Sequence, residues 1–339
     1  MAVSVLITGG AGYIGSHMVK LLQREGCDVT VFDNLSTGHH DAVSSVRFVE
    51  GDLRKAEDIA YALQARKFDV IMHLAASCYV GESMQDPGKY WINNVIGTLN
   101  LLEAMRDATV TRLVFSSSCS TYGNPVSIPM TEEHPQQPVN TYGMTKFVAE
   151  RAMADYGSAC GMRTVALRYF NAAGSDPDGT LGERHDPETH LVPMVLGEAL
   201  RVQRGGDPAA TALEVFGTDF DTPDGTCIRD YVHVSDLCEG HLLAMRTLLQ
   251  AEGGLFEAFN LGTGRGHSVL EVIDACWRVT GIDIHYREAG RRAGDPARLV
   301  AGAGCARSEL GWTPKYTDLA EIIATAWRWF SRHADEDAG

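Results

Sequence analysis

A glycine-rich segment near the N-terminus constrains the fold more than any other feature of this sequence. Residues 3–8 form an apolar run, and Gly9, Gly12 and Gly15 follow it at the opening of a helix-length segment, residues 14–24. Glycines at this spacing permit a tight turn, a close approach of the backbone to a pyrophosphate and close packing of a helix on a sheet. The phosphates then meet free N–H groups and the positive end of the helix dipole. Because a strand precedes the glycines and a helix follows them, the segment predicts a dinucleotide-binding turn rather than an ordinary one.

Two carboxylates further along support a nucleotide site. Asp33 ends the second apolar run, residues 29–33, where folds of this kind place an acid against the adenosine ribose hydroxyls. A carboxylate there repels a 2′-phosphate, so NAD is favoured over NADP as the cofactor. Asp52 follows the third run and would accept a hydrogen bond from the adenine amino group. Each has a plain alternative, which is a turn cap for Asp33 and a helix N-cap for Asp52.

Apolar runs alternate with helix-length segments through the first half of the chain. The predicted strands are residues 3–8, 29–33, 46–49, 70–74, 113–116 and 163–168, and the predicted helices are 14–24, 55–65, 90–106 and 142–156. This alternation requires crossover connections and predicts an α/β fold, a Rossmann-like doubly wound parallel sheet with helices on both faces. The near-continuous apolar strands fit a sheet that is buried on both faces.

The alternation weakens after about residue 171. Loops are predicted at 174–187 and 217–226, weaker helices at 190–204, 234–249 and 269–280, and a strand at 258–261. We therefore predict a NAD-binding Rossmann domain over residues 1–180 and a smaller C-terminal α/β substrate-binding domain over 181–339. Segments around 230–262 are expected to return to the first sheet.

Charge and cysteine content exclude several classes of function. The 339 residues include 29 basic and 44 acidic side chains, a net charge of −15, and the resulting field repels nucleic acid and anionic membranes. No apolar run reaches the roughly 20 residues that a membrane span needs. The eight cysteines show no CxxC or Cys/His ligand spacing, so we predict reduced thiols, no metal site and a cytoplasmic protein.

A tyrosine and a lysine at the start of a predicted helix are the candidate acid–base pair. The spacing of Tyr142 and Lys146 places both side chains on one face of that helix. Tyrosine has an ordinary pKa of about 10, and a nearby cation lowers it. Lys146 and a positively charged nicotinamide ring would provide that charge. Taken alone, the pair is also typical of an amphipathic helix face.

Serine hydroxyls follow the strand predicted at 113–116. Ser116 and Ser118 stand at the carboxyl end of this strand, where parallel sheets bind their ligands. A hydroxyl there can hydrogen-bond a reacting alcohol or ketone. A serine-rich turn is the alternative, and the presence of Tyr142 and Lys146 favours the catalytic interpretation.

With these residues in place, the sequence resembles the extended short-chain dehydrogenase/reductases and, among them, most closely the UDP-glucose 4-epimerase family. The matching segments include TGGAGYIGSH at 8–17, FDNLSTGH at 32–39, FSSSCSTYG at 115–123, TYGMTK at 141–146, LRYFNAAG at 167–174, RDYVHVSDL at 229–237 and RRAGDPA at 291–297. They are spread over nearly the whole chain, and several are specific to nucleotide-sugar epimerases.

The resemblance implies an isomerase of galactose metabolism that interconverts UDP-galactose and UDP-glucose. A tightly held NAD would be reduced and reoxidised while the sugar is oxidised at C4, rotates as a 4-keto sugar and is reduced again. Tyr142 would be the base for the 4′-hydroxyl, Lys146 would contact the nicotinamide ribose and lower the tyrosine pKa, and Ser118 would hydrogen-bond the 4′ oxygen.

The family's pattern also implies the binding residues. The NAD contacts would be Gly9, Gly12, Tyr13, Ile14, Gly15, Asp33, Asn34, Asp52, Leu53, Ala75, Asn94, Ser116, Tyr142, Lys146 and Tyr169. The UDP-sugar contacts would be Ser118, Asn171, His190, Leu191, Phe216, Arg229, Arg292 and Asp295. Both arginines suit the diphosphate, because a guanidinium binds it with a fork of donors, and Asp295 would hold the uridine ribose.

The resemblance further implies a homodimer, in which the helices around 90–106 and 142–156 pair across a two-fold axis. Val95, Leu99, Leu102 and Met105 lie at near-helical spacing in the first of these helices. Such a stripe fits either an interface or plain core.

Several positions depart from the family's pattern. Ser77, Cys78 and Tyr79 stand where some relatives carry a basic residue, and residues 301–305 lack an acid that is usual there. His190 replaces an asparagine of some relatives, so it either binds substrate through its backbone or is a plain loop histidine. Leu299 stands near the position that limits sugar size, where it is less restrictive than an aromatic residue.

Other functions of the same fold differ from this one at a few residues. Epimerases of UDP-GlcNAc or of UDP-xylose and UDP-arabinose stay open, because one or two pocket residues separate them. A nucleotide-sugar dehydratase or decarboxylase is disfavoured because the residues after Ser118, Cys119, Ser120 and Thr121, are not acidic. A non-enzymatic NAD sensor is disfavoured because both Tyr142 and Lys146 are present.

Overall fold

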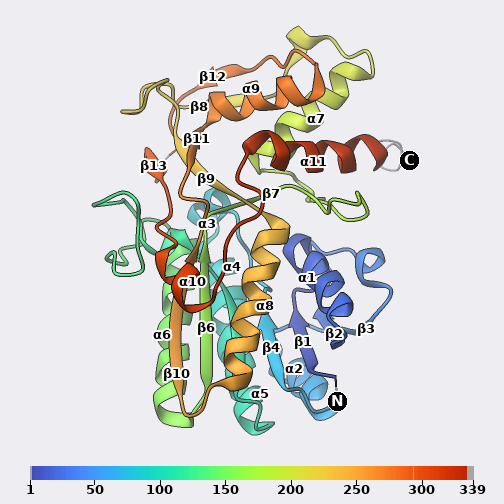
Figure 1. Ribbon diagram of the computed structural model, residues 1–339, viewed down its shortest axis with the longest axis vertical. Coiled ribbons are helices and arrows are strands. Elements are labelled where there is room, and N and C mark those ends of the chain that lie inside the picture. The colour runs from blue at the N-terminus through green and yellow to red at the C-terminus, as the bar shows by residue number, and fades with distance from the viewer. Residues whose placement is uncertain (1, 293, 334–339) are drawn as a thin grey trace.

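A seven-stranded parallel sheet is the centre of the computed structural model, which describes residues 2–292 and 294–333 (Figure 1). Its strand order is β10-β6-β5-β4-β1-β2-β3. The strands are β1 (Ser4–Thr8), β2 (Asp28–Asp33), β3 (Arg47–Glu50), β4 (Val70–His73), β5 (Arg112–Ser118), β6 (Arg163–Tyr169) and β10 (Leu255–Leu261). The order reverses between β1 and β4, which is where open α/β sheets bind ligands at the carboxyl ends of their strands. The predicted Rossmann-like parallel sheet is confirmed.

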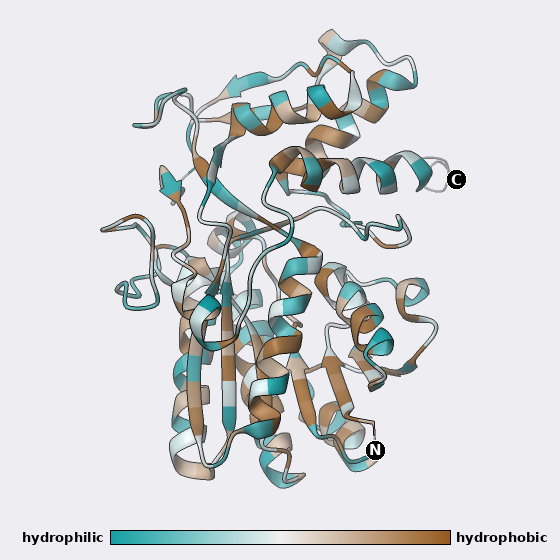
Figure 2. Ribbon diagram, in the orientation of Figure 1, coloured by the Kyte–Doolittle hydropathy of each residue, from teal (hydrophilic) through white to brown (hydrophobic). Residues whose placement is uncertain are grey.

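Alternating side chains of each strand enter two separate cores, one on each face of the sheet. Val5 and Ile7 of β1 pack into one core with α1 (Tyr13–Arg24) and α8 (Val234–Gln250), whereas Leu6 packs into the other. The second core is covered by α2 (Ala56–Gln64), α5 (Gly97–Asp107) and α6 (Thr141–Cys160). Both faces are therefore apolar, and the strands of the large sheet are mostly brown in Figure 2.

The helix predicted at 90–106 is three consecutive pieces instead of one regular helix. It consists of α4 (Pro87–Tyr90), the π-helix η2 (Trp91–Ile96) and α5, after a short helix α3 (Val80–Gln85). The spacing of apolar residues does not reveal a π-turn, because a π-turn adds only one residue to a turn of the helix. The π-turn contains Asn94, which is buried and bonded to neighbouring segments as described below.

The smaller C-terminal part lies above the carboxyl ends of the strands in Figure 1. Three helices, α7 (Leu191–Gln203), α9 (Val269–Thr280) and α11 (Leu319–His333), share a core that includes Val195, Ile273 and Ile322. Beside them lie a small sheet of β7 (Asn171–Ala173), β9 (Ile228–His233), β11 (Gly266–Ser268) and β13 (Arg298–Leu299), and the pair β8 (Glu214–Phe216) and β12 (Arg287–Ala289). A short helix, α10 (Gly304–Glu309), packs near β10.

Several elements of this part were not predicted from the sequence. These include the helix α11 and the strand β9, although Leu319, Ile322, Ile323 and Ala326 form an apolar helical stripe. The segment predicted at 258–261 is β10, which pairs with β6 in the large sheet, and α8 packs against β5 and β6. The loops predicted at 174–187 and 217–226 contain no described helix or strand.

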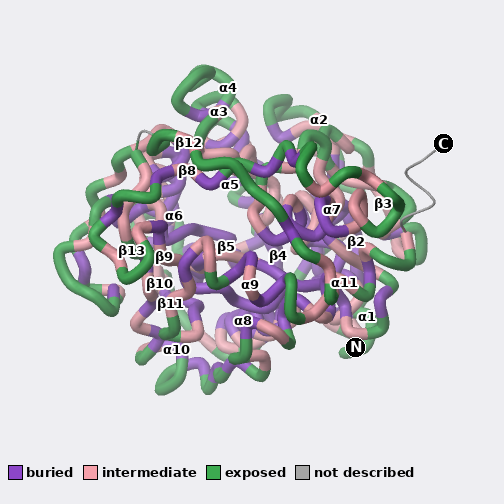
Figure 3. The backbone as a smooth tube through the Cα atoms, turned by 90° about the horizontal axis from the view of Figure 1, so that it is seen from above, coloured by how far each residue is buried: buried purple, intermediate pink, exposed green. Residues whose placement is uncertain are grey.

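The two parts are joined by specific bonds as well as by the chain. The Tyr13 hydroxyl donates to the Gly174 carbonyl at 2.6 Å, and Lys20 of α1 forms a 2.6 Å ion pair with Asp176. Figure 3, seen from above, shows buried backbone in the middle of the molecule and exposed stretches along its rim. Within residues 2–292 and 294–333, no helix combines the length and the apolar character that crossing a membrane demands.

Candidate active site

The turn between β1 and α1 requires glycine for close packing. Gly9 has a φ of 72°, and a Cβ there would lie 2.4 Å from the backbone nitrogen of Ala75. A Cβ on Gly15 would lie 2.1 Å from the Gly9 carbonyl oxygen. Gly12 differs, because its nearest neighbour to such a Cβ is 3.4 Å away. Gly12 is also the N-cap of α1, and no side chain of the described residues caps this helix. The first turn of the helix therefore keeps N–H groups that no side chain of the described residues caps, at the positive end of the helix dipole.

Asp33 reaches this turn from the end of β2. Its Oδ2 accepts from the Ala11 N–H at 3.0 Å and its Oδ1 accepts from the Leu35 N–H at 2.8 Å. Burial raises the pKa of this carboxyl, and the backbone donors act in the opposite direction. Each carboxylate oxygen has lone pairs to spare. Asp33 thus stabilises the glycine turn by these two hydrogen bonds, and its carboxylate can accept further hydrogen bonds at the edge of the turn.

Asn34, Asp52 and Leu53 lie beside Asp33 at the same edge of the sheet. Asn34 donates to Asp52 at 3.3 Å, and hydrogen bonds from Arg54 lower the pKa of Asp52 to about 2. The N-cap of α2 is Lys55, so the helix-cap interpretation of Asp52 is wrong. Leu53 is buried.

Asn94 has every polar atom of its side chain occupied by the protein. Its Oδ1 accepts from the Ser77 N–H at 2.9 Å, and its Nδ2 donates to the Ser77 carbonyl at 2.9 Å and to Thr145 Oγ1 at 3.1 Å. Thr145 belongs to α6, so Asn94 ties the segment after β4 to that helix. Ala75, in the same segment, extends β4 along β1 by donating to the Thr8 carbonyl.

Ser118, Tyr142 and Lys146 come together where the carboxyl end of β5 meets α6. A Cβ on Gly143 would lie 2.3 Å from the Ser120 carbonyl oxygen, so this glycine lets the helix approach the serine segment closely. Asn140 caps the helix by accepting from the Gly143 N–H at 2.8 Å. The Tyr142 N–H donates to Ser83 Oγ at 3.2 Å. These two bonds hold the backbone at the start of α6, which carries Tyr142.

The electrostatics of the tyrosine are dominated by burial. Burial raises the pKa of Tyr142 well above its ordinary value, and hydrogen bonding with Ser118 opposes this shift. Lys146 Nζ lies 5.9 Å from the centroid of the Tyr142 ring. Burial also lowers the pKa of Lys146, to about 8. Within the chain itself, burial therefore affects the pKa of Tyr142 more than Lys146 does.

A buried ion pair underlies this site, and the sequence analysis did not identify it. Arg168 Nη2 lies 2.6 Å from Glu150 Oε2, and Ser117 donates to Glu150 Oε1 at 2.5 Å. Glu150 belongs to α6 and Arg168 to β6, so the pair holds the helix against the sheet. Ser116 Oγ lies 2.9 Å from His241 Nε2, and Tyr169 at the end of β6 has its pKa raised by burial while Ser116 hydrogen bonding opposes the shift.

The residues predicted to hold UDP gather in the C-terminal part. Arg229 donates to the carbonyls of Ile228 and Pro296 and lies 3.5 Å from Asp295 Oδ1. The guanidinium carbon of Arg292 lies 3.8 Å from the centroid of the Phe216 ring. Asn171 begins β7, which pairs with β9 beside Tyr231.

This group also lies within electrostatic range of the catalytic segment. Burial raises the pKa of Cys119 to about 12, and the charge of Arg229 opposes that shift. Residues 301–305 contribute backbone rather than an acid, since the Ala301 N–H donates to Asp230 at 3.1 Å and the Gly302 N–H donates to the Met130 carbonyl at 2.7 Å.

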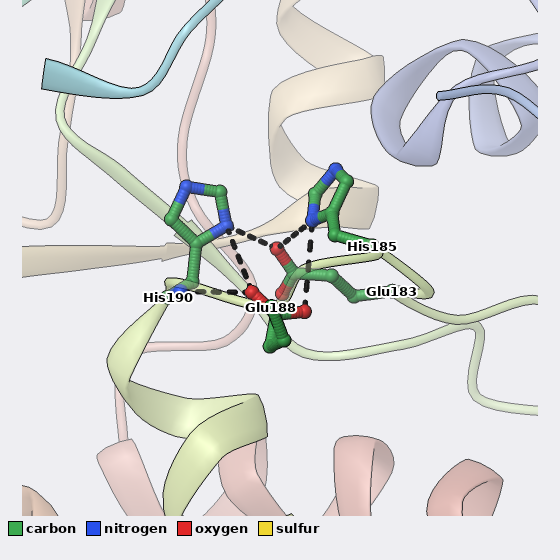
Figure 4. A group of neighbouring side chains, drawn as sticks. All are labelled: Glu183, His185, Glu188 and His190. Atoms are coloured by element: carbon green, nitrogen blue, oxygen red, sulfur yellow. Dashed lines mark hydrogen bonds and ion pairs between the residues drawn. The ribbon is translucent and has the colours of Figure 1, made fainter. Parts of the chain in front are cut away.

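His190 and Leu191 open α7, and the His190 side chain is engaged with acids of the preceding loop. Its Nδ1 lies 2.5 Å from Glu183 Oε1, and His185 and Glu188 complete a cluster of four (Figure 4). Burial opposes charge on these groups, yet their contacts lower the pKa of Glu183 to about 2 and raise that of His185 to about 9. The sequence analysis considered only cysteine-based spacing, whereas the spacing Glu-x-His-x-x-Glu-x-His could have indicated this cluster.

Comparison with known proteins gives concordant results. Residues 5–262 match the model of the NAD dependent epimerase/dehydratase family. A UDP-glucose 4-epimerase of Lactobacillus helveticus is 48% identical over 330 residues, which are 97% of each chain. The crystal structure of a UDP-glucose 4-epimerase from Brucella ovis in complex with NAD is 48% identical, with a TM-score of 0.90 over 97% of this chain and 98% of that one. A UDP-glucose 4-epimerase from Bifidobacterium longum, in complex with NAD+ and UDP, is 34% identical, with a TM-score of 0.90 over 98% of this chain and 99% of that one.

Proposed function

This chain belongs to the NAD-dependent epimerase/dehydratase family, and on that premise we propose that it is an isomerase that interconverts UDP-galactose and UDP-glucose with NAD as its cofactor. The observation that carries the reaction type is the meeting of Ser118, Tyr142 and Lys146 at the carboxyl end of β5. A role in galactose metabolism follows from these substrates.

The residues present fit a dinucleotide. An added Cβ on Gly12 would meet no protein atom closer than 3.4 Å, and the start of α1 is uncapped, which suits a diphosphate that the N–H groups of Tyr13 and Ile14 would meet. Asp33 would accept from the adenosine ribose, and Tyr142 and Lys146 would contact the nicotinamide ribose. Bound NAD would supply the acceptor and donor of the hydride at the sugar C4. The remaining predicted contacts, Asn34, Asp52, Leu53, Ala75, Asn94, Ser116 and Tyr169, surround the same edge of the sheet.

Tyr142 would remove the proton of the sugar 4′-hydroxyl. Ser118 would hold the 4′ oxygen by a hydrogen bond and orient it toward the phenolic oxygen. Because burial raises the pKa of Tyr142, a phenolate needs positive charge nearby. Lys146 is the cation of this chain closest in sequence, one helical turn away on α6. Burial lowers the pKa of Lys146 to about 8.

The nucleotide half of the substrate would be held by the C-terminal part. Arg229 and Arg292 suit the diphosphate, and Asp295 suits the uridine ribose. The contact of Arg229 with Asp295 at 3.5 Å and its bonds to two carbonyls orient it before any ligand arrives. Asn171, Leu191 and Phe216 complete this set. Strong contacts to UDP with few to the sugar allow the keto sugar to turn while the nucleotide stays bound.

A second candidate function is the epimerisation of a larger UDP-sugar such as UDP-GlcNAc. Leu299 packs with Cys119 and Tyr122 in a small buried cluster next to Ser118. A leucine there leaves more room than an aromatic ring. A panel of UDP-galactose, UDP-GlcNAc and UDP-xylose distinguishes the two functions by relative kcat/KM.

We also propose a homodimer and a cytoplasmic location. Met84, Trp91, Ile92 and Ile96 are exposed apolar residues on α3 and the adjacent π-helix, which suits an interface. Of the stripe expected from the sequence, Leu102 and Met105 are instead fully buried in the core of the chain. All eight cysteines are unpaired, which suits a reducing compartment.

The decisive experiment uses purified protein with UDP-galactose and no added NAD. We expect UDP-glucose to form, and we expect NAD to appear in the supernatant when the protein is denatured. Failure to form UDP-glucose by protein that releases stoichiometric NAD would refute the proposed substrate pair. Failure with UDP-galactose, UDP-GlcNAc and UDP-xylose alike, with added NAD as well as without it, would refute the reaction type.

A further inference from the structure

Four potential metal ligands converge in the loop that leads from β7 to α7. Glu183, His185, Glu188 and His190 direct their side chains toward one another in Figure 4. One ligand atom from each lies within 4.8 Å of all the others. None of these side chains is needed for the proton transfer described above, and the imidazole of His190 is held by the cluster.

Three of the separations between ligand atoms are close to those of a small coordination sphere. His185 Nδ1 lies 3.2 Å from Glu183 Oε1 and 3.6 Å from Glu188 Oε2, and His190 Nδ1 lies 3.8 Å from Glu188 Oε1. Ligands about 2.0–2.1 Å from a tetrahedral zinc ion are roughly 3.3 Å from one another. Only the 2.5 Å approach of His190 to Glu183 is clearly shorter, and it must lengthen when an ion enters.

The burial of one ring nitrogen is a further observation. His185 Nδ1 is inaccessible to solvent, and its contacts with the carboxylates of Glu183 and Glu188 do not have the geometry of a good hydrogen bond. Glu183 is buried, with only 4% of its side chain exposed. If the imidazoles of His185 and His190 were neutral, the negative charges of Glu183 and Glu188 would lie close together with no positive charge in the cluster. The adjacent Arg184 does not neutralise them, because it pairs with Asp41 at 2.8 Å.

The surroundings provide both support and access. The ring of Tyr79 lies 5.9 Å from that of His185 and 6.0 Å from that of His190, and Tyr13 lies 6.4 Å from His185. These rings limit the orientations of the imidazoles. A cavity of about 240 Å³ is lined by Glu183, His185 and Glu188 together with apolar residues of α7 and α11. An ion could reach the cluster from there.

We propose that Glu183, His185, Glu188 and His190 bind a divalent transition metal ion of the zinc class. Imidazole with carboxylate is a donor set that suits zinc, cobalt and nickel better than calcium or magnesium. Four protein ligands close a tetrahedral sphere, so the ion is structural and not catalytic. It fastens the loop to the first turn of α7, beside Leu191 and against Tyr13 and Tyr79. The His190 imidazole is then a metal ligand, and the substrate meets only its backbone.

The test begins with metal-free, untagged protein that has been treated with EDTA and dialysed. Zinc is titrated in competition with a chromophoric chelator, and we expect one ion per chain. The His185→Gln/His190→Gln variant should bind zinc at least about 100-fold more weakly, because losing even an outer-shell partner costs about 10–100-fold. His285→Gln is the matched control, since His285 is an exposed histidine 3.2 Å from Asp283 outside the cluster. It should bind zinc like the wild type.

A second measurement on the unaltered chain does not depend on the variants folding. Cobalt added to the metal-free protein should give the intense visible absorption of a tetrahedral site, without the near-ultraviolet band of cobalt–thiolate bonds. Zinc should also raise the Tm of the wild type and of the His285→Gln variant, but not that of the His185→Gln/His190→Gln variant. The proposal is wrong if micromolar zinc does not bind, if a thiolate band appears, or if the double variant binds zinc as tightly as the wild type.

Discussion

The Lys146 ammonium donates a hydrogen bond of 2.7 Å to the backbone carbonyl of Ser116. It also lies 4.7 Å from the centroid of the Phe115 ring. The bond joins the second turn of α6 to the carboxyl end of β5, the two elements that carry Tyr142 and Ser118. A single buried cation thus helps to hold the element that carries the proposed base against the strand that carries its proposed hydroxyl partner.

Removal of the phenolic hydroxyl tests the base directly. Tyr142→Phe should lower kcat by about 10²–10⁴-fold, the usual contribution of general acid–base catalysis. The affinity for UDP should stay within a factor of about two, because the UDP residues lie in the C-terminal part. Turnover is measured with UDP-galactose and UDP binding by calorimetry. Turnover near that of the wild type would assign the proton to another group.

The depressed pKa of Lys146 predicts a stability difference that depends on pH. The folded chain disfavours the charged lysine, whose pKa is about 8 against an ordinary value of 10.5. The folded-state penalty is therefore fully present below pH 8 and disappears as the pH rises toward 10.5. Relative to Lys146→Met, the free energy of unfolding of the wild type should rise by up to about 3 kcal/mol across this range. Urea denaturation at several pH values measures it, and a constant difference would contradict the burial argument.

The buried pair of Glu150 and Arg168 predicts a strong non-additivity. Their side chains are 2% and 6% exposed, so loss of one partner leaves a buried charge without compensation. Arg168→Met should lower the free energy of unfolding by about 3–5 kcal/mol, and Glu150→Gln/Arg168→Met should recover a large part of it. A double-mutant cycle in urea gives the coupling. If the two single changes simply add, the pair does not act as a unit.

Gly12→Ala separates cofactor binding from folding. Gly12 has a φ of −78°, and a methyl group there meets protein atoms no closer than 3.4 Å, so the fold should tolerate it. The same methyl group would occupy the space offered to the diphosphate, so the Kd for NAD should rise at least about tenfold, a change of roughly 1.4 kcal/mol in binding. Less NAD should then be released on denaturation. Gly304→Ala is the matched control and should retain its NAD, because an added Cβ at Gly304 would have no neighbour within 4 Å. An unchanged NAD content in Gly12→Ala would place the diphosphate elsewhere.

The elements that could be predicted from sequence are those governed by local pattern. The glycines at 9–15 predict a tight turn, and the apolar runs of β1, β4 and β5 predict buried parallel strands. Each pattern lies within a few consecutive residues. The helix predicted at 90–106 was wrong in detail, because a π-turn at Asn94 depends on bonds to Ser77 and Thr145 in other segments. The helix α11 was missed although its apolar stripe is regular.

Local pattern by itself determined the parallel sheet, the nucleotide turn and the residues that stand at the carboxyl ends of its strands, because strand and helix periodicities and glycine conformations are properties of neighbouring residues. Only the tertiary structure decided that Arg168 neutralises Glu150, that Arg229 lies beside Asp295, and that Glu183, His185, Glu188 and His190 share one small volume. Those relationships depend on the distances between side chains after the loops have closed, and burial then sets their charges. The pKa of Tyr142 belongs to the second group, because its dominant cause is the protein packed around it.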